Sequence, residues 1–163
     1  MAAKKEVSAE RLEEIAYDVA MLGDGTVMDG KNNLQTIVIH TLARLPDEVY
    51  DAVMYPSPLF IGPGPGQLGE ALQLSLAGPP SGDKPQRIDR NVVVLSNELC
   101  DQPIEDAMWT VAHELAHIYL GHLKRGGASS GVVYPLEAET DADQLAVSWG
   151  FELPEWRRRQ SNE

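Results

Sequence analysis

Hydrophobic residues recur at helical spacing in two stretches near the beginning of the chain. Each stretch places its apolar residues on one face of a helix, which is the pattern of a helix packed against a core. Ser8 precedes the first stretch and can cap a helix, whereas Pro46 follows the second and cannot continue one. The core-facing residues of the two predicted helices are Leu12, Ile15, Ala16 and Val19, and then Leu34, Ile37, Val38, Thr41, Leu42 and Leu45.

The middle of the chain has a different composition, since residues 56–90 carry most of the prolines and many of the glycines. Two short strands are predicted within and beside this region. One is the alternating run Leu72, Leu74 and Leu76, and the other is the continuous apolar run at residues 92–95. A small sheet is therefore expected between the first helices and the last third of the chain.

Two glycine-containing segments are interpreted as loops. Residues 23–33 contain aspartates and glycines, but their spacing does not fit a calcium-binding loop. Residues 64–69 formally match the glycine pattern of a dinucleotide-binding turn. However, Pro65 stands where a phosphate needs a backbone N–H, and no strand–turn–helix unit surrounds the segment. Neither segment is expected to bind a ligand.

The last third of the chain again has helical features. Pro103 suits the first turn of a helix that continues to about Leu123. Residues 126–131 form a connection rich in glycine and serine, and a final helix is predicted over residues 136–149, with Gly150 as its stop. This order of elements predicts an α+β fold, and the length of 163 residues fits a single domain.

Charge and composition exclude several classes of partner. The net charge of −12 argues against nucleic acid, which needs clustered Lys and Arg. The densest basic run, Arg157–Arg159, has acidic neighbours and is interpreted as a solvated helix end or tail. The single cysteine, Cys100, is expected to be a packed side chain without a disulfide partner. The chain lacks a signal-like start and a membrane-length apolar run, so a cytoplasmic protein with no membrane partner is predicted.

One motif carries specific chemistry, the sequence His113-Glu114-Leu115-Ala116-His117. Residues four apart on a helix project from one face, so both imidazoles can meet a single metal ion. A catalytic zinc ion accepts imidazole nitrogens and keeps one position open for water, on which Glu114 can act. A chance match is expected in on the order of 1% of chains of this composition. The mostly apolar flanks predict a buried helix, in which unused histidines would be costly.

A zinc site needs a third protein ligand, and the predicted final helix offers a carboxylate. A metzincin would have glycine at position 120 and histidine at position 123, whereas this chain has leucine at both. Glu139 and Asp143 are four residues apart and share one helix face. Glu137 and Asp141 lie on the other face and remain alternatives to Glu139.

The two motifs together resemble those of the gluzincins, in which an HExxH helix is followed by a helical ExxAD or ExxAN sequence. Within that group, AHELAHIYLGH at Ala112–His122 and EAETDADQLA at Glu137–Ala146 are similar to the ImmA/IrrE family of small cytosolic metallopeptidases. The resemblance covers about residues 105–150 and none of the first 100 residues. It implies a zincin-like fold, with a small mixed sheet packed on the HExxH helix and a following Glu-bearing helix, and a catalytic part at about residues 91–150.

The same resemblance implies a role for each residue of the two motifs. His113, His117 and Glu139 would be the ligands of Zn²⁺. Glu114 would be the general base, and Asp143 would orient a ligand histidine.

A peptidase also needs a donor for the oxyanion that forms during hydrolysis. Tyr134, in the loop before the helix of Glu139, is the candidate, and His122 is the second choice. The predicted function is that of a zinc-dependent endopeptidase acting on a protein or peptide substrate. Two alternatives remain open: a catalytically silent zinc-binding interaction or inhibitor module, and a zinc hydrolase acting on a non-peptide amide.

Overall fold

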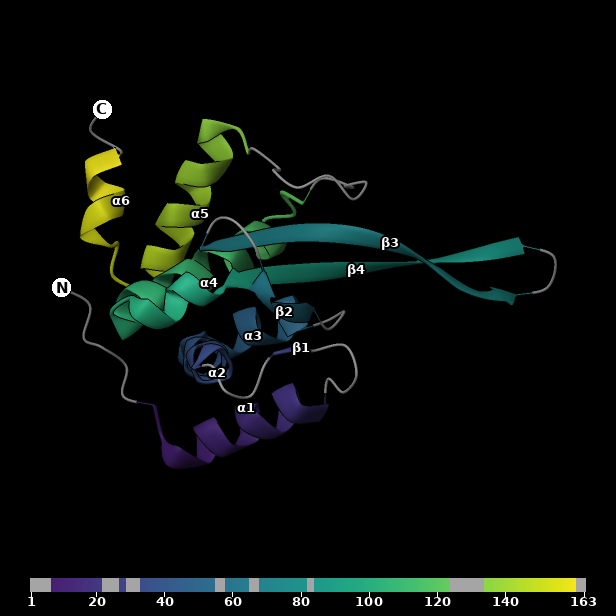
Figure 1. The fold of residues 1–163 in the computed structure, drawn as a ribbon, viewed down its shortest axis with the longest axis horizontal. Helices are drawn as coiled ribbons and strands as arrows, with labels where there is room; N and C mark the ends of the chain where they lie inside the picture. The colour runs from purple at the N-terminus through teal and green to yellow at the C-terminus, as the bar shows by residue number, and fades with distance from the viewer. Residues whose placement is uncertain are drawn as a thin grey trace.

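The computed structural model describes residues 7–21, 27–28, 33–54, 58–64, 68–81, 84–123 and 134–160. These residues form helices and a mixed β-sheet, so the fold class is α+β, as predicted (Figure 1). In chain order the elements are α1 (Ala9–Met21), β1 (Val27–Met28), α2 (Leu34–Arg44), α3 (Asp47–Met54), β2 (Leu59–Gly64), β3 (Gly69–Ser81), β4 (Lys84–Ser96), the 3-10 helix η2 (Asn97–Asp101), α4 (Ile104–Tyr119), α5 (Leu136–Ser148) and α6 (Glu155–Gln160).

The two helices predicted near the start of the chain are confirmed as α1 and α2. At α1, the hydroxyl oxygen of Ser8 accepts a hydrogen bond from the backbone N–H of Arg11 at 3.2 Å and caps the first turn. On α2, all the residues predicted to face the core are buried. A short helix that the pattern did not predict, α3, follows Pro46 directly, with Asp47 and Glu48 favourably placed in its first turn.

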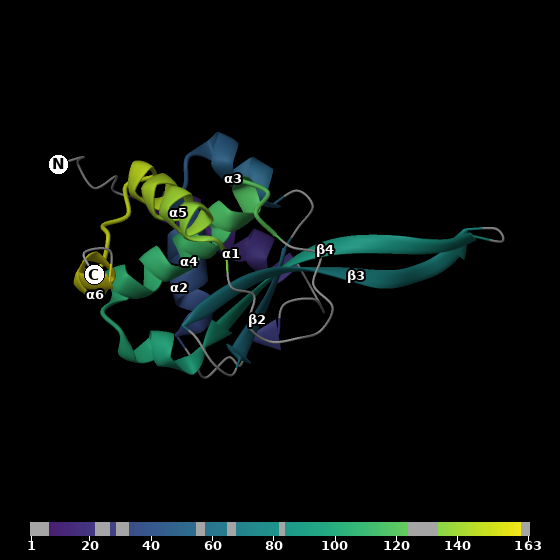
Figure 2. The same cartoon turned by 90° about the horizontal axis from the view of Figure 1, so that it is seen from above.

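The four described strands form one sheet in the order β1–β2–β4–β3. β1 pairs with β2 in parallel, as does β2 with β4, whereas β3 and β4 form an antiparallel hairpin. β3 is therefore an edge strand of the described sheet. Among the described residues, β2 pairs only with Val92–Ser96 of β4, so the remainder of the hairpin is a two-stranded ribbon. Figures 1 and 2 show this ribbon extending away from the helices.

The sheet is larger than the two short strands predicted. β1 lies inside the segment 23–33, which was interpreted as a loop, and prolines and glycines hide the strand character of β2. β3 and β4 contain 13 residues each. Their prolines lie in the ribbon, where each strand has one neighbour and a missing N–H costs little. Pairing is irregular between Gly78 and Ser81, where Pro79 and Pro80 interrupt the ladder.

Helix α4 lies at the centre of the fold. It packs against β3 and β4 on the sheet side, and against α2 and α5 on other sides (Figure 2). Every residue from Ala107 to His117 is buried, which confirms the prediction made from the apolar flanks of the motif. The HExxH segment is thus held between the sheet and the surrounding helices.

Helix α4 ends earlier than predicted, at Tyr119 instead of about Leu123. Gly121 has φ 69°, a left-handed conformation that reverses the chain and that glycine adopts without strain. The backbone N–H of Gly121 donates to the carbonyl of Ile118. The next N–H, that of residue 122, donates to the carbonyl of residue 117. This glycine turn folds residue 122 back over the last turn of the helix.

Helix α5 matches the predicted range. It ends in the same kind of turn, in which Gly150 has φ 94° and acts as the stop that the sequence predicted. The connection predicted at residues 126–131 lies outside the described residues.

Cys100 is a free thiol that is partly buried against the core, as predicted.

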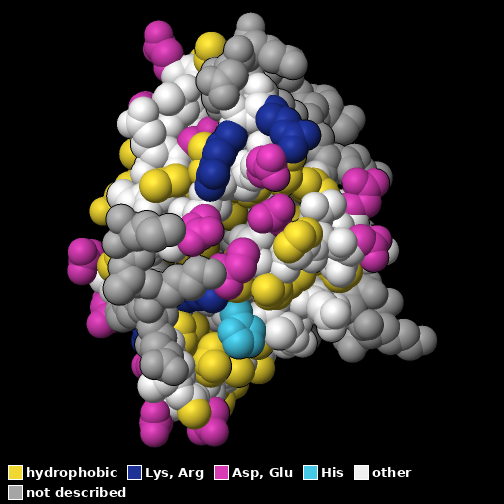
Figure 3. Space-filling view, turned by 90° about the vertical axis from the view of Figure 1, so that its left-hand side faces the viewer, with side chains coloured by type: hydrophobic (Ala, Val, Ile, Leu, Met, Phe, Trp, Pro, Cys, Tyr) yellow, Lys and Arg dark blue, Asp and Glu magenta, His cyan; other side chains and the backbone are white. Residues whose placement is uncertain are grey.

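Figure 3 shows the side of the molecule on which α6 lies, where several acidic side chains are distributed over the surface and basic ones are few. Within the described ranges, no helix is both long enough and apolar enough to cross a membrane.

Candidate metal centre

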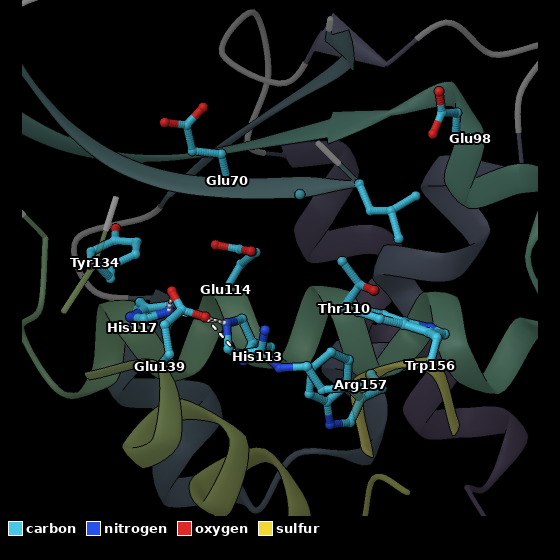
Figure 4. Close-up of a pocket in the computed structure, with 13 residues that line it drawn as sticks. Glu70, Glu98, Thr110, His113, Glu114, His117, Tyr134, Glu139, Trp156 and Arg157 are labelled. Atoms are coloured by element: carbon cyan, nitrogen blue, oxygen red, sulfur yellow. Dashed lines mark hydrogen bonds and ion pairs between the residues drawn. The ribbon is translucent and has the colours of Figure 1, made fainter. Parts of the chain in front are cut away.

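The two histidines of the motif lie on one face of α4 and point to a common place (Figure 4). Nε2 of His113 lies 3.1 Å from Nε2 of His117, and the two rings meet edge to face. The side chains of both residues are buried. Their spacing of four residues produces this convergence, as the helical geometry predicts.

Glu139 of α5 completes the group. Its Oε2 lies 3.4 Å from Nε2 of His113, and its Oε1 lies 3.6 Å from Nε2 of His117. In the part of the chain that the structure describes, these three residues form a group that can hold a metal ion. Glu137 and Asp141, the alternatives to Glu139, are exposed and lie outside the group.

The spacing of the ligand atoms fits one small ion. A tetrahedral ion with ligands at about 2.0–2.1 Å separates each pair of ligand atoms by roughly 3.3 Å. The two imidazole nitrogens are 3.1 Å apart, and each has an oxygen of Glu139 nearby, Oε2 at 3.4 Å from His113 and Oε1 at 3.6 Å from His117. With one oxygen counted for Glu139, the three ligand atoms lie within 4.8 Å of one another. Two imidazole nitrogens and one carboxylate are also a ligand set that catalytic zinc sites use. The residues present therefore fit a metal ion of this kind.

Asp143 lies one turn after Glu139 and contacts the outer nitrogen of His113. Its Oδ1 is 2.9 Å from Nδ1 of His113, so the two side chains are in direct contact. Burial lowers the pKa of His113, but the contacts with Asp143 and Glu139 outweigh burial and raise the pKa to about 9. A carboxylate at this nitrogen suits a histidine whose other nitrogen binds a metal.

Helix α6 contributes a residue that the sequence interpretation placed in solvent. Arg157 donates from Nη2 to Oε2 of Glu139 at 2.7 Å and from Nε to Oδ2 of Asp143 at 3.0 Å. The prediction of a solvated basic run is therefore wrong for Arg157, although Arg158 and Arg159 are exposed. The partners of Arg157 are the carboxylates of Glu139 and Asp143, which are distant in sequence. The sequence alone therefore could not predict this contact, because it forms only when α6 lies next to α5.

An aromatic contact secures α6 in this place. The indole of Trp156 meets the indole of Trp109 edge to face, with ring centroids 5.7 Å apart. Trp109 is buried and also contacts the ring of His113 at 5.1 Å. The packing of two tryptophans thus brings Arg157 to the carboxylates of α5.

The surroundings of His117 consist of rings. The ring of Tyr134 is stacked on that of His117, with centroids 3.9 Å apart and planes inclined by 12°. On another side, Nδ1 of His122 lies 3.2 Å from Nδ1 of His117. Burial, followed by the proximity of His117, lowers the pKa of His122. Both effects favour the neutral form of His122.

The predicted oxyanion donors both have other partners in this structure. The hydroxyl of Tyr134 donates to the carbonyl of Ala71 in β3 at 2.5 Å, so its proton is engaged. Burial and the nearby carboxylates, that of Glu114 first, raise the pKa of Tyr134. His122 faces His117, as described above. The assignment of an oxyanion role to either residue stays a prediction.

Glu114 lies on α4 beside the two candidate ligand histidines and below strand β3 (Figure 4). Burial raises its pKa to about 7, against the opposing effects of His113 and of the backbone of Ala71. Gly69 makes the close approach of β3 possible, because a Cβ there would lie 3.1 Å from both Cγ of Glu114 and Cγ2 of Thr110. Gly69, the last glycine of the segment 64–69, therefore allows β3 to pack closely against the motif glutamate.

A cavity of about 410 Å³ opens in front of this group (Figure 4). β3 forms one wall, α4 the opposite wall and α6 one end. Its lining residues are Leu68, Gly69, Glu70, Glu98, Trp109, Thr110, His113, Glu114, His117, Tyr134, Glu139, Trp156 and Arg157. The cavity therefore also uses residues outside 91–150, the range expected for the catalytic part. Its size suits a side chain or small ligand next to the metal centre.

Comparisons of the chain with protein-family models, with curated proteins and with solved structures found no match. The resemblance to the gluzincins and to the ImmA/IrrE family therefore stays a prediction from the two motifs.

Proposed function

We propose that this protein is a zinc-dependent metallopeptidase that hydrolyses peptide bonds. The observation that carries the proposal is the convergence of His113, His117 and Glu139 within 4.8 Å of one another, with Glu114 beside them. A purely structural metal site has no need of an uncoordinated buried glutamate at this position. The combination of a three-ligand group and a neighbouring base supports catalysis.

The residues of the chain divide the chemistry between them. His113, His117 and Glu139 would hold the ion. Bound zinc would supply Lewis acidity, polarising the scissile carbonyl and lowering the pKa of water. Glu114 would take the proton from the attacking water and later give it to the leaving amine. Without a bound ion, burial raises the pKa of this carboxyl group to about 7, which makes it a better proton acceptor than an ordinary glutamate.

The position of β3 supports a peptide as the substrate. β3 is the edge strand of the described sheet and borders the cavity. An edge strand can pair with an extended peptide through main-chain hydrogen bonds. A peptide laid along β3 would pass in front of Glu114, which lies against Gly69. In a zincin-like arrangement, β3 would bind the extended peptide and the HExxH helix α4 would present Glu114 to it.

The test is proteolysis by the zinc-loaded full chain, with the variants Glu114→Gln and Glu98→Gln measured in parallel on an unfolded protein and a mixed peptide library. Glu114→Gln should keep its zinc and lose cleavage by at least about 100-fold, because amide cannot accept the water proton. Glu98→Gln is the matched control, since Glu98 lines the same cavity but is exposed and lies outside the metal-holding group. It should cleave at close to the wild-type rate.

Each other outcome leads to a different conclusion. Cleavage by Glu114→Gln at the wild-type rate would show that the assigned base is wrong. A wild-type protein that binds zinc and a partner but cleaves neither peptides nor simple amides would be a binding or inhibitor module. Hydrolysis of simple amides without cleavage of peptides would assign it to the zinc hydrolases of non-peptide substrates.

A further inference from the structure

The contact between His117 and His122 has no part in the chemistry described so far. Gly121, with φ 69°, turns the chain at the end of α4, and the backbone N–H of His122 donates to the carbonyl of His117 at 3.0 Å. This turn brings Nδ1 of His122 to 3.2 Å from Nδ1 of His117. The two ring nitrogens can share one proton, with one ring donating and the other accepting.

Only one direction of this hydrogen bond leaves His117 able to bind a metal. A metal ion takes the lone pair on Nε2 of His117, so the ring proton of a ligating His117 lies on Nδ1. His122 must then accept this proton with its own Nδ1 and carry its proton on Nε2. In the opposite arrangement His122 donates, which leaves the proton of His117 on Nε2 and prevents that atom from binding a metal.

We propose that His122 is a positioning residue that accepts the Nδ1–H of His117 and holds this ligand in its metal-binding tautomer. The proposal rests on the metal site of the proposed function. His117 has an exposed fraction of 0%, so solvent does not reach its Nδ1–H, and loss of the acceptor would leave a buried donor unsatisfied. Asp143 occupies the corresponding position at Nδ1 of His113. Each ligand histidine thus has its own partner at the nitrogen that faces away from the ion.

The first test measures zinc affinity of the full chain by competition with a chelator. His122→Phe keeps a ring but has no acceptor, and it should bind zinc about 10- to 100-fold more weakly than wild type. His122→Asn can place an amide oxygen near the former Nδ1, and it should recover most of the loss. The control is His40→Phe on α2, because His40 lies outside the metal-holding group of the described residues, and its affinity should not change. Wild-type affinity in His122→Phe would overturn the proposal.

The second test reads the ring protons directly and does not require zinc to bind. The chain has 4 histidines, so long-range proton–nitrogen NMR spectra can assign the protonated nitrogen of each ring. The expected result is a proton on Nδ1 of His117 and on Nε2 of His122, with the hydrogen-bonded His117 signal shifted downfield and lost in His122→Phe. A proton on Nδ1 of His122 would overturn the proposal. If wild type takes up no zinc, the proposed function fails, and these spectra still decide the direction of the hydrogen bond.

Discussion

The two histidines of the motif on α4, both candidate metal ligands, lie in different surroundings. Nδ1 of His113 is 2.9 Å from Asp143, a carboxylate that Arg157 of α6 also contacts. Nδ1 of His117 is 3.2 Å from the ring of His122, and its face is stacked on Tyr134. Nδ1 of His113 therefore has charged partners on the side of α6, where Trp109 also contacts its ring, whereas Nδ1 of His117 faces a neighbouring ring.

This difference indicates separate tasks for the two sides. The charges beside His113 favour its protonated form, so a metal ion must displace a proton there. The rings beside His117 fix the ligand through contact and through one shared proton. Changes in pH and in ionic partners should therefore act mainly on the side of α6, and changes in packing mainly on the side of Tyr134.

The largest effect is expected from pH. Below its pKa of about 9, His113 carries a proton that competes with the metal, so apparent zinc affinity should rise by about tenfold per pH unit as the pH approaches that value. Above about pH 9 this contribution should level off. Chelator competition at several pH values measures the slope. A zinc affinity that is constant between about pH 7 and pH 9 would mean that the neighbouring carboxylates do not keep His113 protonated in this range.

An intermediate effect is expected from Arg157. Arg157→Met removes the two charge-assisted hydrogen bonds to Glu139 and Asp143, and the metal-free protein should lose about 2 kcal/mol of unfolding free energy. Arg159→Met is the control on the same helix, because Arg159 pairs with Glu155 in an exposed ion pair. Its denaturation midpoint should not change measurably. Equal midpoints for both variants in urea titrations would contradict the role of Arg157.

The smallest effect is expected from the two glycines that end α4 and α5. Neither glycine has an atom near the position of an added Cβ, so Gly121→Ala and Gly150→Ala should each cost only the strain of a positive φ, about 1 kcal/mol. Gly121→Ala should also weaken zinc binding, because it disturbs the turn that carries His122. Gly150→Ala should leave zinc binding unchanged. Equal zinc affinities for Gly121→Ala and Gly150→Ala would show that the turn at Gly121 does not influence the metal centre.

The sequence predicts the parts of the centre that lie within one helix. His113, Glu114 and His117 follow from helical spacing, and Asp143 follows from its spacing to Glu139. Spacing alone left Glu137 open beside Glu139. The resemblance to the gluzincins favoured Glu139, and the structure brings Glu139 to the histidines. Local patterns are sufficient where one element carries the whole arrangement.

The remaining contributions depend on contacts between distant elements. Arg157 resembles a solvated basic residue until Trp156 packs on Trp109 and brings α6 to α5. The approach of Gly69 to Glu114 depends on the packing of β3 over α4, and the extent of the hairpin is concealed by its prolines. Such features have no periodic signal in the sequence, since they arise from pairs of residues that meet only in the folded chain.

The central claim is a metal ion held by His113, His117 and Glu139. The most direct test is elemental analysis of zinc per chain in the wild type, in Glu139→Ala and in Glu137→Ala, all purified side by side after zinc has been supplied. Glu137 is exposed on the same helix and serves as the matched control. The account predicts about one zinc ion per chain in the wild type and in Glu137→Ala, and a clear loss in Glu139→Ala. Full zinc content in Glu139→Ala, or none in the wild type, would contradict it.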